Sequence, residues 1–191
     1  MDFRQRLFQY RSYTPIPFLL AMIFFARPTP VTLIGGFCVV IVGEFIRLWG
    51  VAIAGSETRT TGPVGGTFLI TRGPFAYVRN PLYVGNMLLY FGVGVMSNTP
   101  VLAMIALCFF FFQYSLIVSL EEEYLLKTFP QEYIEYARIV PRFIPTFSKY
   151  DGGNNPQPQL DWKRGLHSEK RTLQAISILT IVSFLLWWIR R

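Results

Sequence analysis

Arg79, Asn80 and Pro81 form the first group of residues that could do chemistry, because they follow a turn and precede an apolar stretch. Gly73 and Pro74 predict the turn, and Pro81 disfavours helical backbone at the residue before it. Asn80 is therefore expected to cap a helix that contains Pro81 in its first turn. The free N–H groups at the start of such a helix suit an anionic ligand, with Arg79 beside them. A capped helix whose arginine meets lipid headgroups is the alternative interpretation.

Three consecutive carboxylates, Glu121, Glu122 and Glu123, follow another apolar stretch. Acidic residues at a helix C-terminus are unfavourable for the helix dipole, and adjacent like charges repel each other. We therefore expect the helix to continue past them, and at least one of the three to have a cationic partner. A helix end exposed to water would explain the same residues.

The segment from Gln131 to Pro145 combines tyrosines and arginines with apolar residues. This pattern predicts an amphipathic helix near 131–139 that lies at the membrane interface, followed by an extended exit. Arg138 and Arg142 would then face phospholipid headgroups. The pattern alone leaves open whether the segment takes part in chemistry or only anchors the protein.

The elements that position these groups are predicted by five apolar stretches. The chain has 191 residues, of which 52% are hydrophobic and 15% charged, against about 25% charged in a typical soluble domain. A membrane-spanning helix needs about 20 mostly apolar residues. The stretches lie near 14–26, 31–54, 82–96, 101–120 and 173–191. The first is short enough to be a tilted span or a re-entrant piece, and the prediction is an all-α, polytopic transmembrane helical bundle of about five spans.

The length of the chain allows one domain, so any chemistry must be built from loops and helix ends of the bundle. The predicted membrane core covers 1–147 and includes the interfacial helix. Residues 148–172 predict a linker, because they are rich in Gly, Asn, Pro and Gln around 152–158. This leaves 173–191 as a C-terminal transmembrane helix. Catalytic groups are not expected in the linker, where the one histidine, His167, lies.

The basic residues predict the orientation of the chain in the membrane. The formal charge is +7, which we attribute to the bias of membrane proteins toward basic cytoplasmic loops and not to nucleic-acid binding. If the N-terminus is cytoplasmic, 14 of the 18 Lys and Arg residues lie on that side, against Arg27, Arg190 and Arg191 on the other. Both long polar segments, 55–81 and 121–171, then face the cytoplasm. The prediction is a multi-pass membrane protein whose active site faces the cytoplasm.

Glu44 and Arg47 lie inside the second apolar stretch, three residues apart on one helical face. Charges inside the membrane are costly and are often functional, while an internal ion pair is the simpler interpretation. Cys38 and Cys108 lie in apolar stretches and are predicted to be small core residues. With one histidine in the chain, no metal site is predicted.

Taken together, these segments resemble the isoprenylcysteine carboxyl methyltransferase and phospholipid methyltransferase superfamily of integral membrane methyltransferases. Three motifs of that superfamily occur here, in its order and spacing, between Thr67 and Pro145. The matching residues are Gly73, Phe75, Arg79, Asn80, Pro81 and Tyr83 in the first motif, Glu121, Glu122, Leu125, Phe129 and Pro130 in the second, and Tyr133, Tyr136, Val140, Pro141, Arg142, Ile144 and Pro145 in the third.

The resemblance implies that S-adenosyl-L-methionine is the methyl donor, bound without a Rossmann domain. It implies cofactor-binding residues in the segment before the first motif, in that motif and at the first glutamate. Carried over to this chain, these are Thr67, Phe68, Leu69, Ile70, Phe75, Asn80, Pro81, Leu82, Tyr83 and Glu121. Arg79, Glu121 and Arg142 are the expected catalytic residues, and Arg79 with the free N–H groups can take the carboxylate of the donor.

The methyl acceptor is left open as a lipid, a prenylated group or a small hydrophobic molecule that presents a carboxylate, an amine or a thiol. Asn80 stands where the prenylcysteine enzymes usually have histidine, and Ile117 stands where the eukaryotic ones have an arginine implicated in substrate binding. Membrane lipids are the expected partners, without nucleic acid or metal. Two other functions remain open: a membrane reductase of the sterol-reductase type that uses NADPH, and a non-catalytic membrane scaffold.

Overall fold

The computed structural model describes residues 2–55, 69–152 and 157–190, and every regular element among them is a helix. The helices are α1 (Phe3–Tyr10), α2 (Pro15–Phe24), α3 (Pro30–Ala54), the 3-10 helix η2 (Gly73–Ala76), α4 (Pro81–Met96), α5 (Pro100–Thr128), α6 (Pro130–Ile139) and α7 (Trp162–Ile189). The prediction of an all-α fold is confirmed.

Three of these helices, α3, α5 and α7, are long and apolar enough to cross a membrane. Helix α2 has 10 residues and α4 has 16, which correspond to about 15 Å and 24 Å at 1.5 Å per residue. The hydrocarbon core of a bilayer is about 30 Å thick. The structure therefore supports an integral membrane bundle, while the predicted count of five spans stays a prediction for the two shorter helices.

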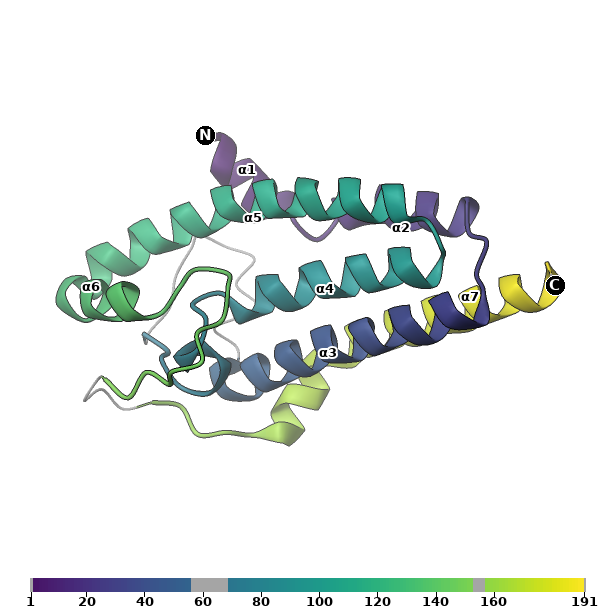
Figure 1. Ribbon diagram of the computed structural model, residues 1–191. Coiled ribbons are helices and arrows are strands. Elements are labelled where there is room, and N and C mark those ends of the chain that lie inside the picture. Colours follow the sequence, from purple (N-terminus) through teal and green to yellow (C-terminus); the bar gives the residue numbers. More distant parts are fainter. Residues whose placement is uncertain (1, 56–68, 153–156, 191) are drawn as a thin grey trace.

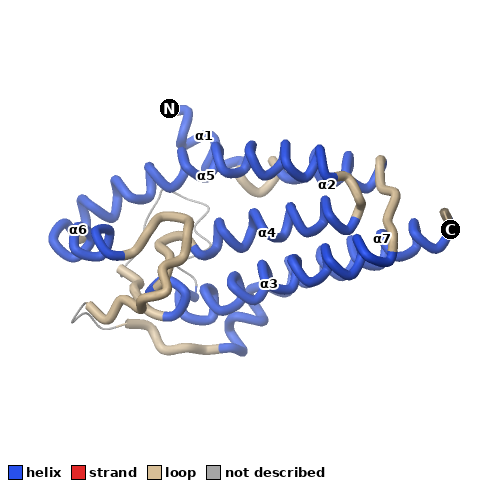
Figure 2. The backbone as a smooth tube through the Cα atoms, viewed as in Figure 1, coloured by secondary structure: helices blue, strands red, loops and turns tan. Residues whose placement is uncertain are grey.

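The long helices lie side by side along one direction (Figure 1). The longer loops gather at one end of the bundle, and the short α2–α3 and α4–α5 connections lie at the other end (Figure 1). Helix α4 packs between α3 and α5, α7 packs on α3, and α2 packs on both α4 and α5. Helix α5 extends beyond α4 and carries α6 at its tip, next to η2 and the segment 140–150 (Figure 2). We call this end, formed by η2, α6 and 140–150, the loop end.

Helices α3 and α4 approach each other closely where glycines of the two helices face each other. A Cβ atom added to Gly36 would lie 2.4 Å from the backbone nitrogen of Met96, and one added to Gly92 would lie 2.9 Å from the carbonyl oxygen of Gly36. A Cβ on Gly43 would lie 2.9 Å from the carbonyl oxygen of Gly85. Small residues let helix backbones meet closely in a membrane, where packing and not the exclusion of water holds helices together. This contact makes α3 and α4 the fixed centre of the bundle.

Helix α5 continues without a break to Thr128, well beyond the predicted apolar span 101–120. The expectation that the helix runs past Glu121, Glu122 and Glu123 is confirmed. The predicted interfacial helix 131–139 corresponds to α6, which has an acidic residue in its first turn and a basic residue in its last turn, as the helix dipole favours.

The structure corrects the end of the predicted linker 148–172, because α7 begins at Trp162 and not at residue 173. The side chain of Asp161 accepts a hydrogen bond of 3.0 Å from the backbone N–H of Arg164 and caps the helix. The first turns of α7 are polar, so composition alone suggested a linker there. A second correction concerns Cys38 and Cys108, which are exposed on the outside of their helices and are not core residues.

The contact between α3 and α4 leads to a prediction about two adjacent glycines. Gly36→Ala should lower the free energy of unfolding by about 1–3 kcal/mol, because its methyl group would overlap the backbone of α4. Gly35→Ala is the matched control, since nothing lies within 4 Å of the added Cβ at that position. Unfolding of the purified protein in detergent measures both, and equal stability of the two variants would contradict this account of the packing.

Candidate active site

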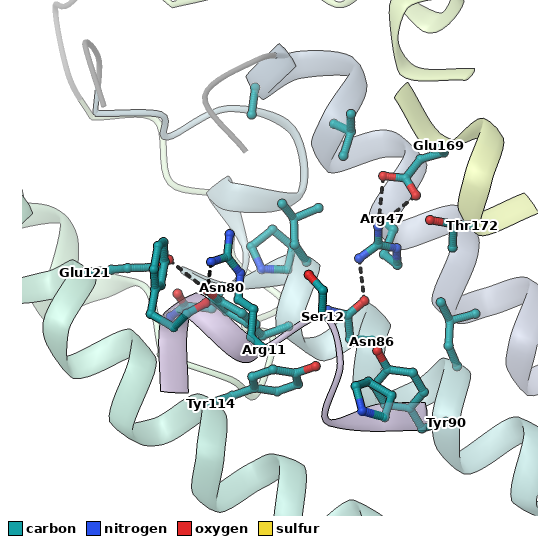
Figure 3. Close-up of a pocket in the computed structure, with 18 of the residues that line it drawn as sticks. Arg11, Ser12, Arg47, Asn80, Asn86, Tyr90, Tyr114, Glu121, Glu169 and Thr172 are labelled. Carbon is teal, nitrogen blue, oxygen red and sulfur yellow. Dashed lines mark hydrogen bonds and ion pairs between the residues drawn. The ribbon is translucent and has the colours of Figure 1, made fainter. Parts of the chain in front are cut away.

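A cavity of about 860 Å³ runs from the loop end into the interior of the bundle. Every described helix contributes residues to its wall, and several of these residues carry charge (Figure 3). Its loop-end half is lined by Leu69, Ile70, Phe75, Arg79, Asn80, Pro81, Leu82, Tyr83, Glu121, Glu122, Tyr133 and Tyr136. Its interior half is lined by Arg47, Asn86, Tyr90, Tyr114, Glu169, Thr172, Ile176 and Leu179, among others. The volume lies within the range of about 300–1,000 Å³ that is usual for small-molecule sites.

Glu121 and Tyr83 meet across the loop-end half of the cavity. The Tyr83 hydroxyl on α4 donates a hydrogen bond of 2.8 Å to Oε1 of Glu121 on α5. The contact fixes one oxygen of the carboxylate and leaves the carboxylate at the cavity wall. Residues predicted from the first and second motifs therefore share one cavity, although Tyr83 and Glu121 are 38 positions apart along the chain.

Glu122 holds two arginines that come from different segments. Arg79 Nη2 lies 3.2 Å from one oxygen of Glu122, and Arg142 pairs with the other. Arg79 Nη1 also donates to the backbone carbonyl of Ala137 at 3.2 Å. Hydrogen bonds between ionised partners are about twice as strong as neutral ones. The expectation that one of the three glutamates has a cationic partner is confirmed, and Glu123 also pairs with Arg4 at the surface.

Arg79 and Arg142 do not stand in the same relation to the cavity. Arg79 lines it, while Arg142 is not among the lining residues and reaches Glu122 from outside. Leu69, Ile70 and Phe75 line the cavity. The predicted residues Thr67 and Phe68 lie outside the described residues.

Asn80 stands at the start of α4, as predicted, but its side chain does not cap the helix. The amide Nδ2 of Asn80 donates instead to the backbone carbonyl of Arg142 at 3.1 Å. This is a correction to the sequence prediction. The side chain links α4 to the segment after α6, and the N–H groups of Leu82 and Tyr83 in the first turn have no partner within the helix.

The segment 140–150, predicted as an extended exit, closes the loop end by backbone hydrogen bonds. The Arg79 N–H donates to the Pro141 carbonyl at 2.9 Å. The N–H groups of Thr146 and Tyr150 donate to carbonyls of Tyr77 and Ala76 at 2.9 and 3.0 Å. These bonds hold the turn before α4 against the third motif.

Tyr136 ties α6 to the apolar wall of the cavity. Its hydroxyl donates a hydrogen bond of 2.7 Å to the carbonyl of Phe75. Burial raises the pKa of the Tyr136 phenol above its ordinary value, so the group stays a neutral hydrogen-bond donor. Gln157 secures the other side of this wall, because its side chain bonds the backbone of Leu69 and Thr71 at 2.9 Å each.

The interior half of the cavity contains a polar cluster that the sequence did not predict. Nη2 of Arg47 lies 2.9 and 2.7 Å from the two oxygens of Glu169 on α7, and Nη1 donates to Asn86 on α4 (Figure 3). The Glu169 side chain is fully buried. Arg47 thus joins α3, α4 and α7 in the middle of the bundle.

The ion pair predicted between Glu44 and Arg47 is present but secondary. Oε2 of Glu44 lies 3.7 Å from Nε of Arg47, whereas Glu169 approaches the guanidinium to 2.7 Å. An arginine inside an apolar stretch requires a counter-charge. Arg47 in the sequence could therefore have predicted a buried acidic partner such as Glu169. The sequence prediction paired Arg47 with Glu44, the nearest acidic residue along the chain, and not with Glu169 on α7.

The described residues contain no group of three or more His, Cys, Asp or Glu side chains that could hold a metal ion. His167 is exposed on the first turns of α7 and does not line the cavity. The cavity offers instead carboxylates, several arginines, free helix N–H groups and an apolar wall.

The phospholipid methyltransferase family matches residues 31–132. The chain belongs to this family. The match runs from the start of α3 through η2, α4 and α5 into α6, so it contains Arg79 to Tyr83 and Glu121 but neither Arg142 nor α7. Membership of this superfamily of integral membrane methyltransferases, which the resemblance predicted, is confirmed.

Three curated proteins are similar to this chain. It is 31% identical over 145 residues to the cobalt-zinc-cadmium resistance protein CzcN of Cupriavidus metallidurans, covering 72% of this chain and 63% of that protein. It is 37% identical over 84 residues to the nickel-cobalt-cadmium resistance protein NccN of Alcaligenes xylosoxydans xylosoxydans, covering 44% and 39%. It is 27% identical over 113 residues to protein-S-isoprenylcysteine O-methyltransferase B of Arabidopsis thaliana, covering 58% and 57%.

The chain thus spans less than two thirds of the length of each of these relatives. No solved structure matches it. The family and the Arabidopsis relative agree on methyl transfer at a membrane, whereas the names of the two resistance proteins describe no reaction.

The role of Glu122 leads to a prediction about stability at the loop end. Glu122→Ala should lower the free energy of unfolding by about 1–3 kcal/mol, because it leaves Arg79 and Arg142 without their shared partner at a partly exposed site. It should also speed amide hydrogen exchange in 140–150. Glu123→Ala removes an exposed pair and is the control, for which little change is expected. Normal exchange in the Glu122 variant would contradict the role given to this carboxylate.

Proposed function

We propose that this protein transfers a methyl group from S-adenosyl-L-methionine to a hydrophobic or lipid-linked acceptor at the membrane. The observation that carries the proposal is the shared cavity of Arg79 to Tyr83 and Glu121, which come from two motifs of the family and meet at the loop end. The family supports methyl transfer. The choice of donor and acceptor rests on the chemistry of the wall.

The loop-end half of the cavity has groups that suit each part of the donor. Leu69, Ile70 and Phe75 provide an apolar surface for an adenine ring. Glu121 has a carboxylate oxygen at the wall beyond its bond from Tyr83, which can accept from ribose hydroxyls or from an amino group. The free N–H groups at the start of α4 suit a carboxylate. The donor, when bound, supplies an activated methyl group on a sulfonium.

The residues of this chain act by positioning and by excluding water. In-line displacement requires the acceptor atom to face the methyl carbon opposite the leaving sulfur. Glu122 fixes Arg79, and the segment 140–150 fixes the turn before α4, so the wall is preorganised. A carboxylate or thiolate acceptor needs no base, whereas an amine must lose a proton.

We place the active site on the cytoplasmic face of the membrane. Helices α3, α5 and α7 make the protein an integral membrane protein, and the loop end with the residues next to it carries five basic residues, Arg72, Arg79, Arg138, Arg142 and Lys149. Basic loops favour the cytoplasmic side.

Calorimetry with S-adenosyl-L-methionine tests the donor. The protein in detergent should bind it, and Glu121→Gln should weaken binding about 10- to 100-fold, because a bond to an ionised group contributes about 1.5–3 kcal/mol. Glu123→Gln, an exposed change two positions away, should bind like the wild type. Absence of binding, or preferential binding of NADPH, would reject the proposal in favour of a scaffold or a reductase.

Methyl transfer itself can be followed with labelled donor. Purified protein in vesicles of total membrane lipid should move label from S-adenosyl-L-methionine into a lipid-extractable fraction, and Glu121→Gln should slow this transfer. Glu123→Gln again serves as the control. Donor binding without any transfer to lipid or to added hydrophobic thiols, amines or carboxylates would reject the acceptor class.

A further inference from the structure

A second, smaller cavity of about 300 Å³ lies between α2 and α7. Its wall is formed by apolar side chains alone, which are Ile16, Leu19, Leu20, Ile23, Leu179 and Val182. We call it the α2–α7 slot. Ile16 and Leu20 are about half or more exposed, so the slot lies at the outer surface of the bundle, where a membrane protein meets hydrocarbon chains.

The slot is continuous with the main cavity. Ile16, Leu19 and Leu179 line both spaces. A path therefore leads from the groups at the loop end, through the interior half of the cavity, to an apolar opening at the lipid-facing surface. A molecule that fills this path must be polar at one end and apolar at the other.

Helix α7 supplies one wall of this path along a single face. Glu169, Thr172, Ile176 and Leu179 line the main cavity and follow each other at helical spacing. The face changes from polar at Glu169 and Thr172, on the side nearer the loop end, to apolar at Ile176 and Leu179. This gradient matches an amphiphile whose head group lies toward the methyl donor and whose chain points into the slot.

The ion pair between Arg47 and Glu169 holds this face against the cavity. Glu169 is fully buried, and both of its oxygens contact the Arg47 guanidinium. Arg47 belongs to α3, which is fixed to α4 by the glycine contact. This pair therefore contributes to the position of α7 relative to the loop-end half, together with the hydrogen bond from the Asp161 N–H to the Ala52 carbonyl and the close contact of Gly165 with Ala52. Loss of one partner of a buried pair is costly.

We infer that α7, which lies outside the segment matched by the family, selects the acceptor: Leu179 with Ile16 and Leu19 sets the bulk of the single apolar chain that the α2–α7 slot accepts, and the Arg47–Glu169 pair positions this wall. The inference rests on the proposed function for its link to methyl transfer. It assigns the slot to the chain of a membrane amphiphile.

Photolabelling tests the occupant without using activity. The probe is a long-chain fatty alcohol with a diazirine near the end of its chain, added to the full chain in detergent. Labelling of α2 and α7 peptides should be saturable and should fall when unlabelled alcohol is added. Leu179→Trp should reduce the saturable labelling at least tenfold, because the indole fills the slot. Ile178→Trp is the matched control, since Ile178 is exposed and lines neither cavity.

The outcomes separate the two proposals. Saturable labelling that is lost in Leu179→Trp and kept in Ile178→Trp supports the slot, and donor binding by calorimetry should be unchanged in both variants. Non-saturable labelling, or equal labelling of the two variants, would overturn the slot whatever the donor does. Loss of donor binding in the wild type together with saturable labelling would overturn the proposed function and leave the slot as a lipid-chain site.

A second pair of variants tests the positioning role of Glu169. Glu169→Gln should weaken saturable labelling at least fivefold and raise the KM for a long-chain acceptor, while the Kd of the donor changes less than twofold. Lys170→Gln, an exposed change on the same turn, should alter neither. An equal loss of donor and probe binding in Glu169→Gln would show a general structural role and overturn the assignment.

Discussion

The site depends first on the carboxylate of Glu122, which binds Arg79 and Arg142 at once. These arginines stand on the two sides of the loop end, one before α4 and one after α6. Because one anion holds both, the turn that precedes α4 and the exit from α6 cannot move independently. The backbone hydrogen bond from Arg79 to Pro141 and the side-chain hydrogen bond from Asn80 to the carbonyl of Arg142 add to the same closure. These contacts tie together the segments that wall the loop-end half of the cavity.

In the remainder of the bundle, one closely packed pair of helices forms the centre, and two further helices, α5 and α7, complete the walls of the cavity. Helices α3 and α4 meet through glycines, so the distance between their backbones does not depend on flexible side chains. We call this pair of helices the platform. Helix α5 brings Glu121 to this platform, and α7 closes the interior half through Arg47. The family match covers the platform and α5 but not α7. In the proposed function, the part that binds the methyl donor and the part that meets the acceptor are thus carried by different segments.

Much of the loop-end half of the cavity could be predicted from the sequence, because its residues lie in compact motifs beside apolar stretches. The resemblance of these motifs to the methyltransferase superfamily predicted that Arg79 to Tyr83 and Glu121 share a site, and they line one cavity. Glu169 could not be predicted, since it lies in a polar stretch and its partner is 122 positions away. The side chain of Asn80 was predicted to cap the N–H groups of its own helix, whereas it donates a hydrogen bond to the carbonyl of Arg142, which is distant in sequence. Long-range polar partners are decided by packing, which local patterns do not contain.

The length of α5 has a consequence for the depth of Glu121 in the membrane. Glu121 lies 21 residues after Pro100, the first residue of the helix, which corresponds to about 32 Å at 1.5 Å per residue. This is close to the thickness of the hydrocarbon core, about 30 Å. A helix that starts at one boundary of the bilayer therefore delivers its carboxylate to the other. The length of the helix therefore places Glu121 at the boundary between hydrocarbon and water. At that depth a charged molecule can stay in contact with water while an apolar molecule stays in contact with the hydrocarbon of the membrane.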